Sequence, residues 1–162
     1  RQMCIRDRYY ITGNHEQYLG SARAMDIVRS AHIEVLDNRS VMIDGARLIG
    51  LSYVSQGSSP ELLATMHSVL GSDAQTPTIL LYHSPALLEA ARDAGVDVYA
   101  AGHTHRGQIF PFHLITGLVF HGHDTGLFRD GAYTAYVSSG VGTWGPPVRT
   151  SGRSEIVRMT FE

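Results

Sequence analysis

Apolar residues along this chain fall into short continuous runs, which predict strands, and into stretches with helical spacing. The run TILLY at residues 78–82 has the length and continuity of a strand that is buried on both faces. The expected strands and hairpins cover residues 9–12, 41–52, 78–82, 96–102, 127–139 and 154–161, with turns at Asp44-Gly45 and Asp130-Gly131. The expected helices cover residues 15–31, 59–70 and 85–94. This order of elements predicts a mixed α/β fold built in layers.

The composition fits one folded domain and argues against several classes of protein. The chain has 162 residues, of which 43% are hydrophobic and 17% are charged, as in globular proteins. Its net charge of −2 provides no basic surface for nucleic acid, so we expect no nucleic-acid binding. No apolar run approaches the about 18 residues that a membrane span needs, and residues 1–8 lack the features of a signal peptide. The single cysteine, Cys4, leaves nitrogen and oxygen as the ligands for any bound metal.

Polar clusters follow three of the expected strands at the point where each strand ends. The three clusters are Asn14-His15-Glu16, His83 and His103-Thr104-His105. Ligand sites of open α/β sheets form at the carboxyl ends of strands. Imidazole nitrogens and amide or carboxylate oxygens suit Zn, Mn or Fe, and the glycines beside these clusters let the backbone approach closely. One such histidine alone is more often structural, but three clusters together predict a metal site.

The same residues resemble the motifs of the calcineurin-like metallophosphoesterases. The order and approximate spacing of TGNHE at 12–16, His83 and GHTH at 102–105 agree with that family. The longer segments GHTHRGQIFPF (102–112), AYVSSGVGTWGPPVR (135–149) and SEI (154–156) resemble a bacterial branch that has membrane-associated members. The resemblance implies a layered αββα sandwich that hydrolyses phosphate mono- or diesters. It leaves membrane association of the parent protein and its cellular location open, and it implies no partner protein.

The resemblance also implies a role for each residue of the three clusters. Asn14, His83 and His103 would bind one metal, and His105 would bind a second. His15 would contact the phosphate and protonate the leaving oxygen, with Glu16 either orienting it or acting as an ordinary first-turn helix acid. The cofactors would be two divalent or trivalent ions of Mn, Fe or Zn. Two such ions about 3.5–4 Å apart activate a bridging hydroxide and neutralise the phosphoryl oxygens.

The chain departs from the family pattern upstream of residue 9. The family's aspartate-x-histidine motif and its glycine-aspartate motif, which supplies a metal-bridging aspartate, precede the GNHE motif, and only Asp7 is acidic among residues 1–8. We therefore expect residues 9–162 to be the C-terminal part of a metallophosphoesterase domain that lacks its N-terminal strands. Residues 1–8 would be an unrelated leader, and the chain alone would be weakly active or inactive. The alternatives are a non-catalytic module that binds a single metal and an interaction domain whose site has decayed.

Two further motifs invite functional interpretations that their context argues against. GVGTWG at 140–145 matches the dinucleotide-binding fingerprint, but Pro146-Pro147 follows where that motif must open a helix. We expect these glycines to shape a loop near the metals, with Trp144 and Arg149 in its wall. HGHD at 121–124 contains a second histidine pair, which we interpret as a solvated loop.

Overall fold

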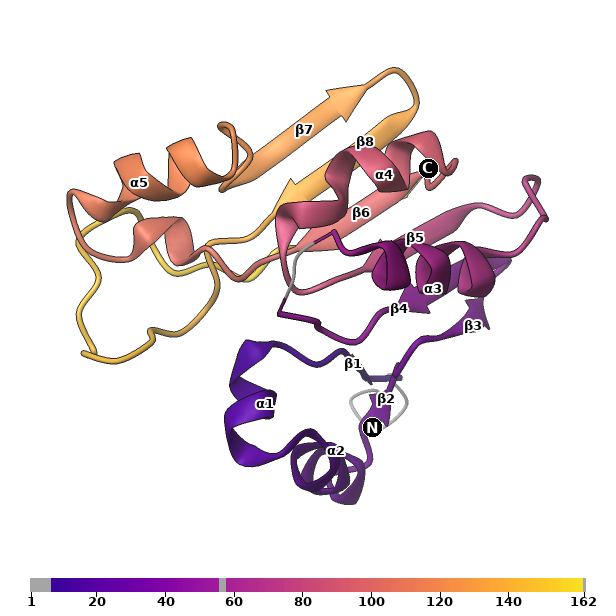
Figure 1. Cartoon of the computed structure of the whole chain (residues 1–162), viewed down its shortest axis with the longest axis horizontal. Helices are drawn as coiled ribbons and strands as arrows, with labels where there is room; N and C mark the ends of the chain where they lie inside the picture. Colours follow the sequence, from indigo (N-terminus) through magenta and orange to yellow (C-terminus); the bar gives the residue numbers. More distant parts are fainter. Residues whose placement is uncertain (1–6, 56–57, 162) are drawn as a thin grey trace.

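The computed structural model describes residues 7–55 and 58–161 and contains two sheets (Figure 1). The larger sheet has six strands in the order β3-β4-β5-β6-β8-β7. Its strands are β3 (Arg39–Ile43), β4 (Ala46–Gly50), β5 (Thr78–Leu81), β6 (Val98–Ala101), β7 (Gly126–Asp130) and β8 (Tyr133–Val137). The four central strands are parallel, and β3 and β7 run antiparallel at the edges. The smaller sheet pairs β1 (Tyr9–Tyr10) with β2 (Glu34–Val35) in parallel. The predicted α/β class is confirmed, and the arrangement is consistent with a metallophosphoesterase-type sandwich.

Both predicted hairpins are present in the larger sheet. In the first, Ile43 pairs with Ala46, and the two residues between them, Asp44 and Gly45, have positive φ angles of 46° and 85°. Such angles are typical of the tight turns that match the twist of a hairpin. In the second hairpin Asp130 pairs with Tyr133, so the turn lies one residue later than the sequence predicted.

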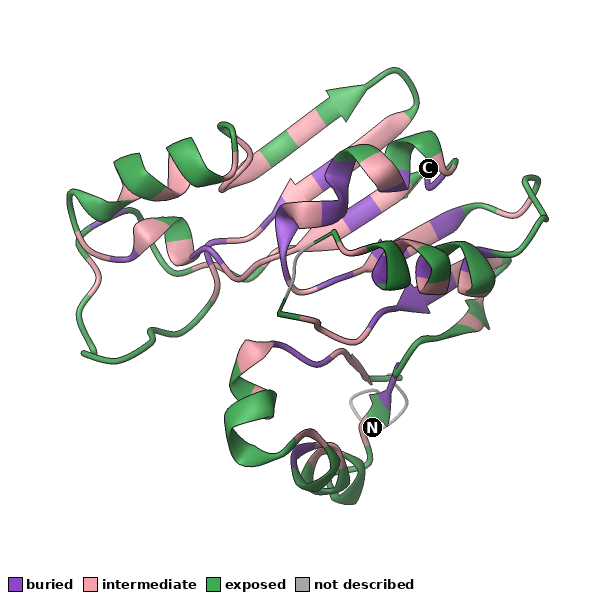
Figure 2. Ribbon diagram, viewed as in Figure 1, coloured by how far each residue is buried: buried purple, intermediate pink, exposed green. Residues whose placement is uncertain are grey.

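Helices on one face of the larger sheet enclose the main core (Figures 1 and 2). Helix α3 (Pro60–Leu70) begins where predicted, with the Ser59 hydroxyl accepting a hydrogen bond from the Leu62 N–H. Helix α4 (Leu88–Asp93) follows a 3₁₀ turn, η2 (Pro85–Leu87). The buried apolar side chains come from both helices and from four strands: Leu62, Met66, Leu88, Ala91, Ile49, Leu80, Tyr99, Ala135 and Val137. None of the helices in the described part of the chain is long and apolar enough to cross a membrane.

Burial along β5 alternates, which corrects the prediction that this strand is covered on both faces. Thr78 and Leu80 are buried, whereas Ile79 and Leu81 are half-buried. The buried side chains face α3 and α4, and the described residues cover the opposite face of the strand only in part. A continuous apolar run does not by itself reveal how much of each face is covered.

Three other parts of the chain differ from the predicted elements. The helix expected over residues 15–31 is two helices, α1 (Asn14–Leu19) and α2 (Ser21–Ser30), because Gly20 has a φ of 85° that interrupts the helical path. Helix α5 (Phe112–Val119) was not predicted. Residues 154–161 were predicted to form a closing strand, but the structure assigns none there, and Ile156 is 88% exposed. Despite its apolar alternation, this segment pairs with none of the strands in the described part of the chain.

We expect Leu80→Ala to lower the free energy of unfolding by about 2–5 kcal/mol, since it opens a cavity in the core. Leu80 is fully buried in the central strand β5. Met42, on the edge strand β3, is 59% exposed, so Met42→Ala should change stability by no more than about 0.5 kcal/mol. Urea denaturation followed by circular dichroism measures both, and equal losses would contradict this description of the core.

Candidate metal centre

Strands β5 and β6 deliver two of the predicted histidines to the same edge of the larger sheet. Their parallel pairing continues beyond the strands, because the Tyr82 N–H donates to the Ala100 carbonyl at 3.2 Å. One step further, the Gly102 N–H donates to the His83 carbonyl at 3.0 Å. His83 and the residue after Gly102, His103, are therefore held beside each other by the backbone itself.

The segment between β1 and α1 brings Asn14 to this edge from the other side. The preceding residue, Gly13, packs so closely that a Cβ atom there would lie 2.8 Å from the His83 ring. Tyr53, which follows β4, joins this segment to the larger sheet, because its N–H donates to the Thr12 hydroxyl at 3.0 Å. The Tyr53 ring also packs edge-on against His83, with 5.4 Å between ring centroids. Close backbone approach and these contacts place Asn14 against His83.

Three side-chain donor atoms converge at this point. Nε2 of His83 lies 2.8 Å from Oδ1 of Asn14 and 3.0 Å from Nδ1 of His103. Donor atoms bound at 2.0–2.2 Å to one metal ion are separated from each other by about 2.8–3.6 Å. The observed distances and the donor types therefore fit a single cation such as Zn, Mn or Fe. We call Asn14, His83 and His103, the candidate ligands of such a cation, the ligand trio.

The electrostatics of the two imidazoles suit metal binding. Burial, followed by the proximity of His103, lowers the pKa of His83 to about 4. Burial and the nearby His15 also lower the pKa of His103. Both rings are therefore neutral at neutral pH, which is the form that binds metals. Within the described ranges no three His, Cys, Asp or Glu side chains form a metal-binding group, and the ligand trio reaches three donors only through the Asn14 amide.

The GHTH segment has strained backbone. His103, His105 and Arg106 have φ angles of 71°, 50° and 50°, a region that residues with a Cβ atom rarely occupy. Buried Thr104 stabilises the segment, because its hydroxyl donates to the Asp124 carbonyl at 2.5 Å and accepts from the Arg106 N–H at 3.2 Å. Strain that persists under such contacts is typical of functional sites. Asp124, from the HGHD motif, thus supports the GHTH segment through its backbone.

His105 lies in the same cavity as the ligand trio but contacts a different group. The Arg149 guanidinium donates to its carbonyl at 2.9 Å and approaches its Nδ1 at 3.4 Å. Burial, then the Arg149 charge, lower the pKa of His105, so this ring is also neutral. The hydrogen bonds of the described residues do not join His105 to the ligand trio.

Two residues of the C-terminal motifs hold the loop under His105, a role that sequence reasoning did not assign. Arg149 also donates to the carbonyls of Ser139 at 3.0 Å and Gly142 at 2.6 Å. The Glu155 carboxylate accepts hydrogen bonds from the Ser139 N–H at 2.7 Å and the Tyr136 hydroxyl at 3.0 Å. The only sequence signal for these two residues is that they belong to the motifs GPPVR and SEI. Their hydrogen-bond partners are too distant in sequence to be predicted from spacing.

His15 and Glu16 begin helix α1 in different environments. His15 is exposed and lines the cavity beside the ligand trio. Glu16 accepts hydrogen bonds from the Tyr10 hydroxyl at 2.7 Å and from the Gly13 N–H. Burial raises the pKa of Glu16, but these two bonds, together with a bond to its own backbone and the proximity of His83, lower the pKa overall. The described contacts give Glu16 a first-turn helix role, and its orientation of His15 stays a prediction.

All the predicted site residues except Glu16 line one cavity of about 510 Å³. Its walls include the ligand trio, His15 and His105, together with Tyr18, Phe112, Ile115, Phe120 and Trp144. Trp144 is therefore a wall residue, as predicted, whereas Arg149 does not line this cavity and instead donates to backbone carbonyls. The loop that carries it opens no helix, which agrees with the rejection of the dinucleotide interpretation.

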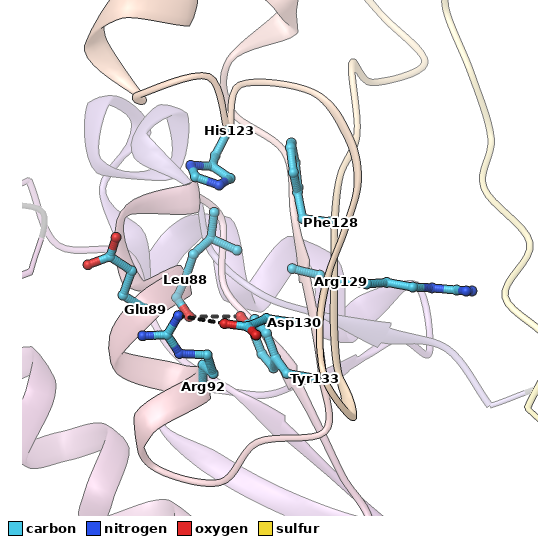
Figure 3. A pocket seen from close by; sticks show the side chains of 9 residues that line it. Leu88, Glu89, Arg92, His123, Phe128, Arg129, Asp130 and Tyr133 are labelled. Atoms are coloured by element: carbon cyan, nitrogen blue, oxygen red, sulfur yellow. Dashed lines mark hydrogen bonds and ion pairs between the residues drawn. The ribbon is translucent and has the colours of Figure 1, made fainter.

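A second cavity, of about 260 Å³, lies between α4 and the β7–β8 hairpin (Figure 3). His123 of the HGHD motif lines it and packs edge-on against Phe128, with 4.7 Å between ring centroids. Its Arg92 pairs with Asp130 at 2.8 Å. The second histidine pair thus does not extend the candidate metal centre, and His121 is exposed in a turn.

Curated proteins named metallophosphoesterases match nearly the whole chain. An uncharacterized metallophosphoesterase from Helicobacter pylori (strain J99) is 34% identical over 154 residues, which are 93% of this chain and 41% of that protein. Another, from Campylobacter jejuni, is 38% identical over 161 residues, 95% of this chain and 42% of that protein. A Bos taurus transmembrane protein with metallophosphoesterase domain is 32% identical over 171 residues, 95% of this chain and 38% of that protein. The chain thus spans about two fifths of the length of these relatives. No family model and no solved structure matches it.

We expect Gly13→Ala to weaken binding of Zn or Mn by about 10- to 100-fold, the range found when support for a metal ligand is lost. The added methyl group would displace the His83 ring, while the Gly13 φ of −117° accepts alanine without strain. Gly142→Ala is the matched control, because no atom lies within 4 Å of the added methyl group. Isothermal titration measures both affinities, and an unchanged affinity for Gly13→Ala would argue against His83 as a ligand.

Proposed function

The chain is a relative of the metallophosphoesterases, and on this premise we propose that it carries part of a metal centre that hydrolyses phosphate mono- or diesters. In this proposal Asn14, His83 and His103 hold one metal ion. The observation that carries the proposal is that Oδ1 of Asn14 and Nδ1 of His103 lie 2.8 Å and 3.0 Å from the same atom, Nε2 of His83. When bound, metal ions at such a centre lower the pKa of water and neutralise phosphoryl oxygens.

In this proposal His105, whose imidazole lines the same cavity, binds a second metal ion. Its ring is neutral and belongs to the same cavity, while Arg149 fixes its backbone. One imidazole does not hold an ion by itself, so this position needs ligands beyond the described residues. We therefore place residues 9–162 as the C-terminal part of a metallophosphoesterase domain and expect low activity from this chain alone.

The proposed general acid is His15. Its side chain is exposed and lines the cavity, so it would face a phosphate ester bound there. An imidazole there can donate a proton to the leaving oxygen, a contribution worth about 10²- to 10⁴-fold in rate. Helix α1 places it one residue after Asn14, so the same backbone positions the metal ligand and the acid.

The second candidate is a non-catalytic module that binds a single metal. It is favoured because His105 stands apart from the other candidate ligands. The members of the ligand trio contact each other directly, whereas His105 contacts Arg149. Under this alternative the His15 side chain has no catalytic task. The two functions differ in the number of metal ions bound and in turnover.

Metal analysis of the full-length parent protein, combined with hydrolysis of an aryl phosphate, tests the proposal. Near two equivalents of metal with hydrolysis supports the dinuclear enzyme, and one equivalent without turnover supports the single-metal module. The absence of bound metal after saturation would indicate a decayed site and refute both. Turnover that is lost on chelation and restored by added metal ties the activity to the centre.

We expect His103→Ala and His15→Ala to separate binding from proton transfer in the full-length parent protein. His103→Ala removes a donor of the ligand trio, so turnover and one metal equivalent should be lost together. His15→Ala should lower kcat by about 10²- to 10⁴-fold with metal content unchanged. His67→Ala, an exposed histidine on α3, serves as the control and should change neither quantity. Full activity of His103→Ala would refute the assignment.

A further inference from the structure

Helix α5 presents its apolar side chains to solvent, the reverse of an ordinary surface helix (Figure 2). The exposed fractions of its outward side chains run from 52% for Phe112 to 78% for Leu118. We call the exposed residues of this helix and the segment before it the outer apolar face: Phe110, Phe112, Leu114, Ile115, Leu118 and Val119. An apolar face of this kind on a folded domain marks an interaction surface.

Polar and close contacts hold the inner face of α5 in place. The Thr116 hydroxyl donates to the Asp124 carboxylate at 2.9 Å, and the His113 ring lies 3.4 Å from the Ser151 hydroxyl. Gly107 packs so tightly that a Cβ atom there would lie 2.3 Å from the His113 backbone nitrogen. The helix therefore cannot turn its apolar side chains inward without losing these contacts.

A loop near α5 adds further exposed apolar side chains. Val141, Trp144 and Val148 are all exposed. The buried Gln108 side chain fixes the loop, because its amide donates to the Trp144 carbonyl at 2.8 Å and accepts from the Trp144 N–H at 2.7 Å. Trp144 lines the same cavity as Phe112 and Ile115, so the loop and the outer apolar face are neighbours. In Figure 1 both lie at the same end of the molecule.

The charge of this end differs from that of the rest of the chain. Residues 102–124 and 138–155 contain three arginines and two acidic residues, Asp124 and Glu155. Two of these arginines, Arg106 and Arg153, are exposed. Asp124 and Glu155 are half-buried and accept hydrogen bonds, so the exposed charges of these segments are positive on a chain with a net charge of −2.

From these observations we propose that this end of the molecule docks onto the surface of an anionic lipid bilayer. Helix α5 lies in the interface with its outer apolar face among the acyl chains, Trp144 sits at the headgroup level, and Arg106 and Arg153 face anionic headgroups. Positive charge favours anionic lipid, and a bilayer accommodates a single apolar helix without a matching groove. This inference is independent of the proposed function. Since Phe112, Ile115 and Trp144 also line the candidate metal centre, docking places that cavity beside the membrane surface.

Trp144 is the only tryptophan of the chain, so its fluorescence reports on the docking loop directly. We expect phosphatidylglycerol vesicles to shift its emission to the blue and to co-sediment with the metal-free chain, with weaker binding to phosphatidylcholine vesicles. Lipids brominated in the acyl chains should quench the emission. The double variant Leu114→Glu/Leu118→Glu should reduce the partition coefficient by about tenfold or more, since charged side chains enter acyl chains poorly. Ile27→Glu, on α2 and 60% exposed, is the matched control and should bind as the parent chain does.

Several results would overturn the proposal. They are an unchanged Trp144 emission with no co-sedimentation, equal losses in the control and the double variant, or unchanged partitioning of the double variant. A self-association that Leu118→Glu abolishes, without any vesicle binding, would identify the face as an interface between copies of the chain. Thermal melts verify that the variants remain folded. The vesicle experiments use the metal-free chain. Their outcome therefore neither supports nor refutes the proposed metal centre, which metal analysis tests on its own.

Discussion

The hydrogen bond from the Gly102 N–H to the His83 carbonyl is the interaction on which the candidate metal centre depends. It extends the parallel pairing of β5 and β6 beyond the last paired residues of the two strands. The imidazoles of His83 and His103, which follow different strands, therefore lie side by side. The strands beneath it are held in the core by Leu80 and Tyr99, both fully buried. The packing that holds these two strands in the core therefore also fixes the distance between the His83 and His103 rings. Loosening the core would separate the two rings.

A second constraint is the strained GHTH backbone. Non-glycine residues at positive φ cost about 1–3 kcal/mol each, and His103, His105 and Arg106 all adopt such angles. Surrounding hydrogen bonds from Thr104 and Arg149 hold the segment in this conformation. Glu155 in turn holds the loop that Arg149 contacts. The ligand geometry at the sheet edge therefore depends on residues 40 or more positions away in sequence, none of which reaches the ligand trio.

Sequence pattern predicted the sheet well, since strands 78–82 and 96–102 and both hairpins have local signals in apolar runs and Asp-Gly turns. It failed for residues 154–161 because alternation predicts a strand without supplying its partner. It also missed α5, which has only eight residues and so is shorter than the stretch over which helical periodicity can be recognised. At the site, strand-end reasoning placed Asn14, His83 and His103, which the structure brings together. The contacts of Arg149 and Glu155 depend on tertiary partners, so the sequence could not supply them.

The reversed polarity of α5 follows from what its inner face must do. The strained GHTH segment needs hydrogen-bonding partners, and Asp124, which accepts from Thr104, also accepts from Thr116 of α5. Gln108 is likewise buried and uses its amide to hold the Trp144 loop. When the polar side chains of a short segment are all turned toward such a site, its apolar side chains are left on the outside. The outer apolar face is thus the structural counterpart of the polar, strained GHTH segment, and the lipid surface proposed above is an environment in which such an arrangement is stable.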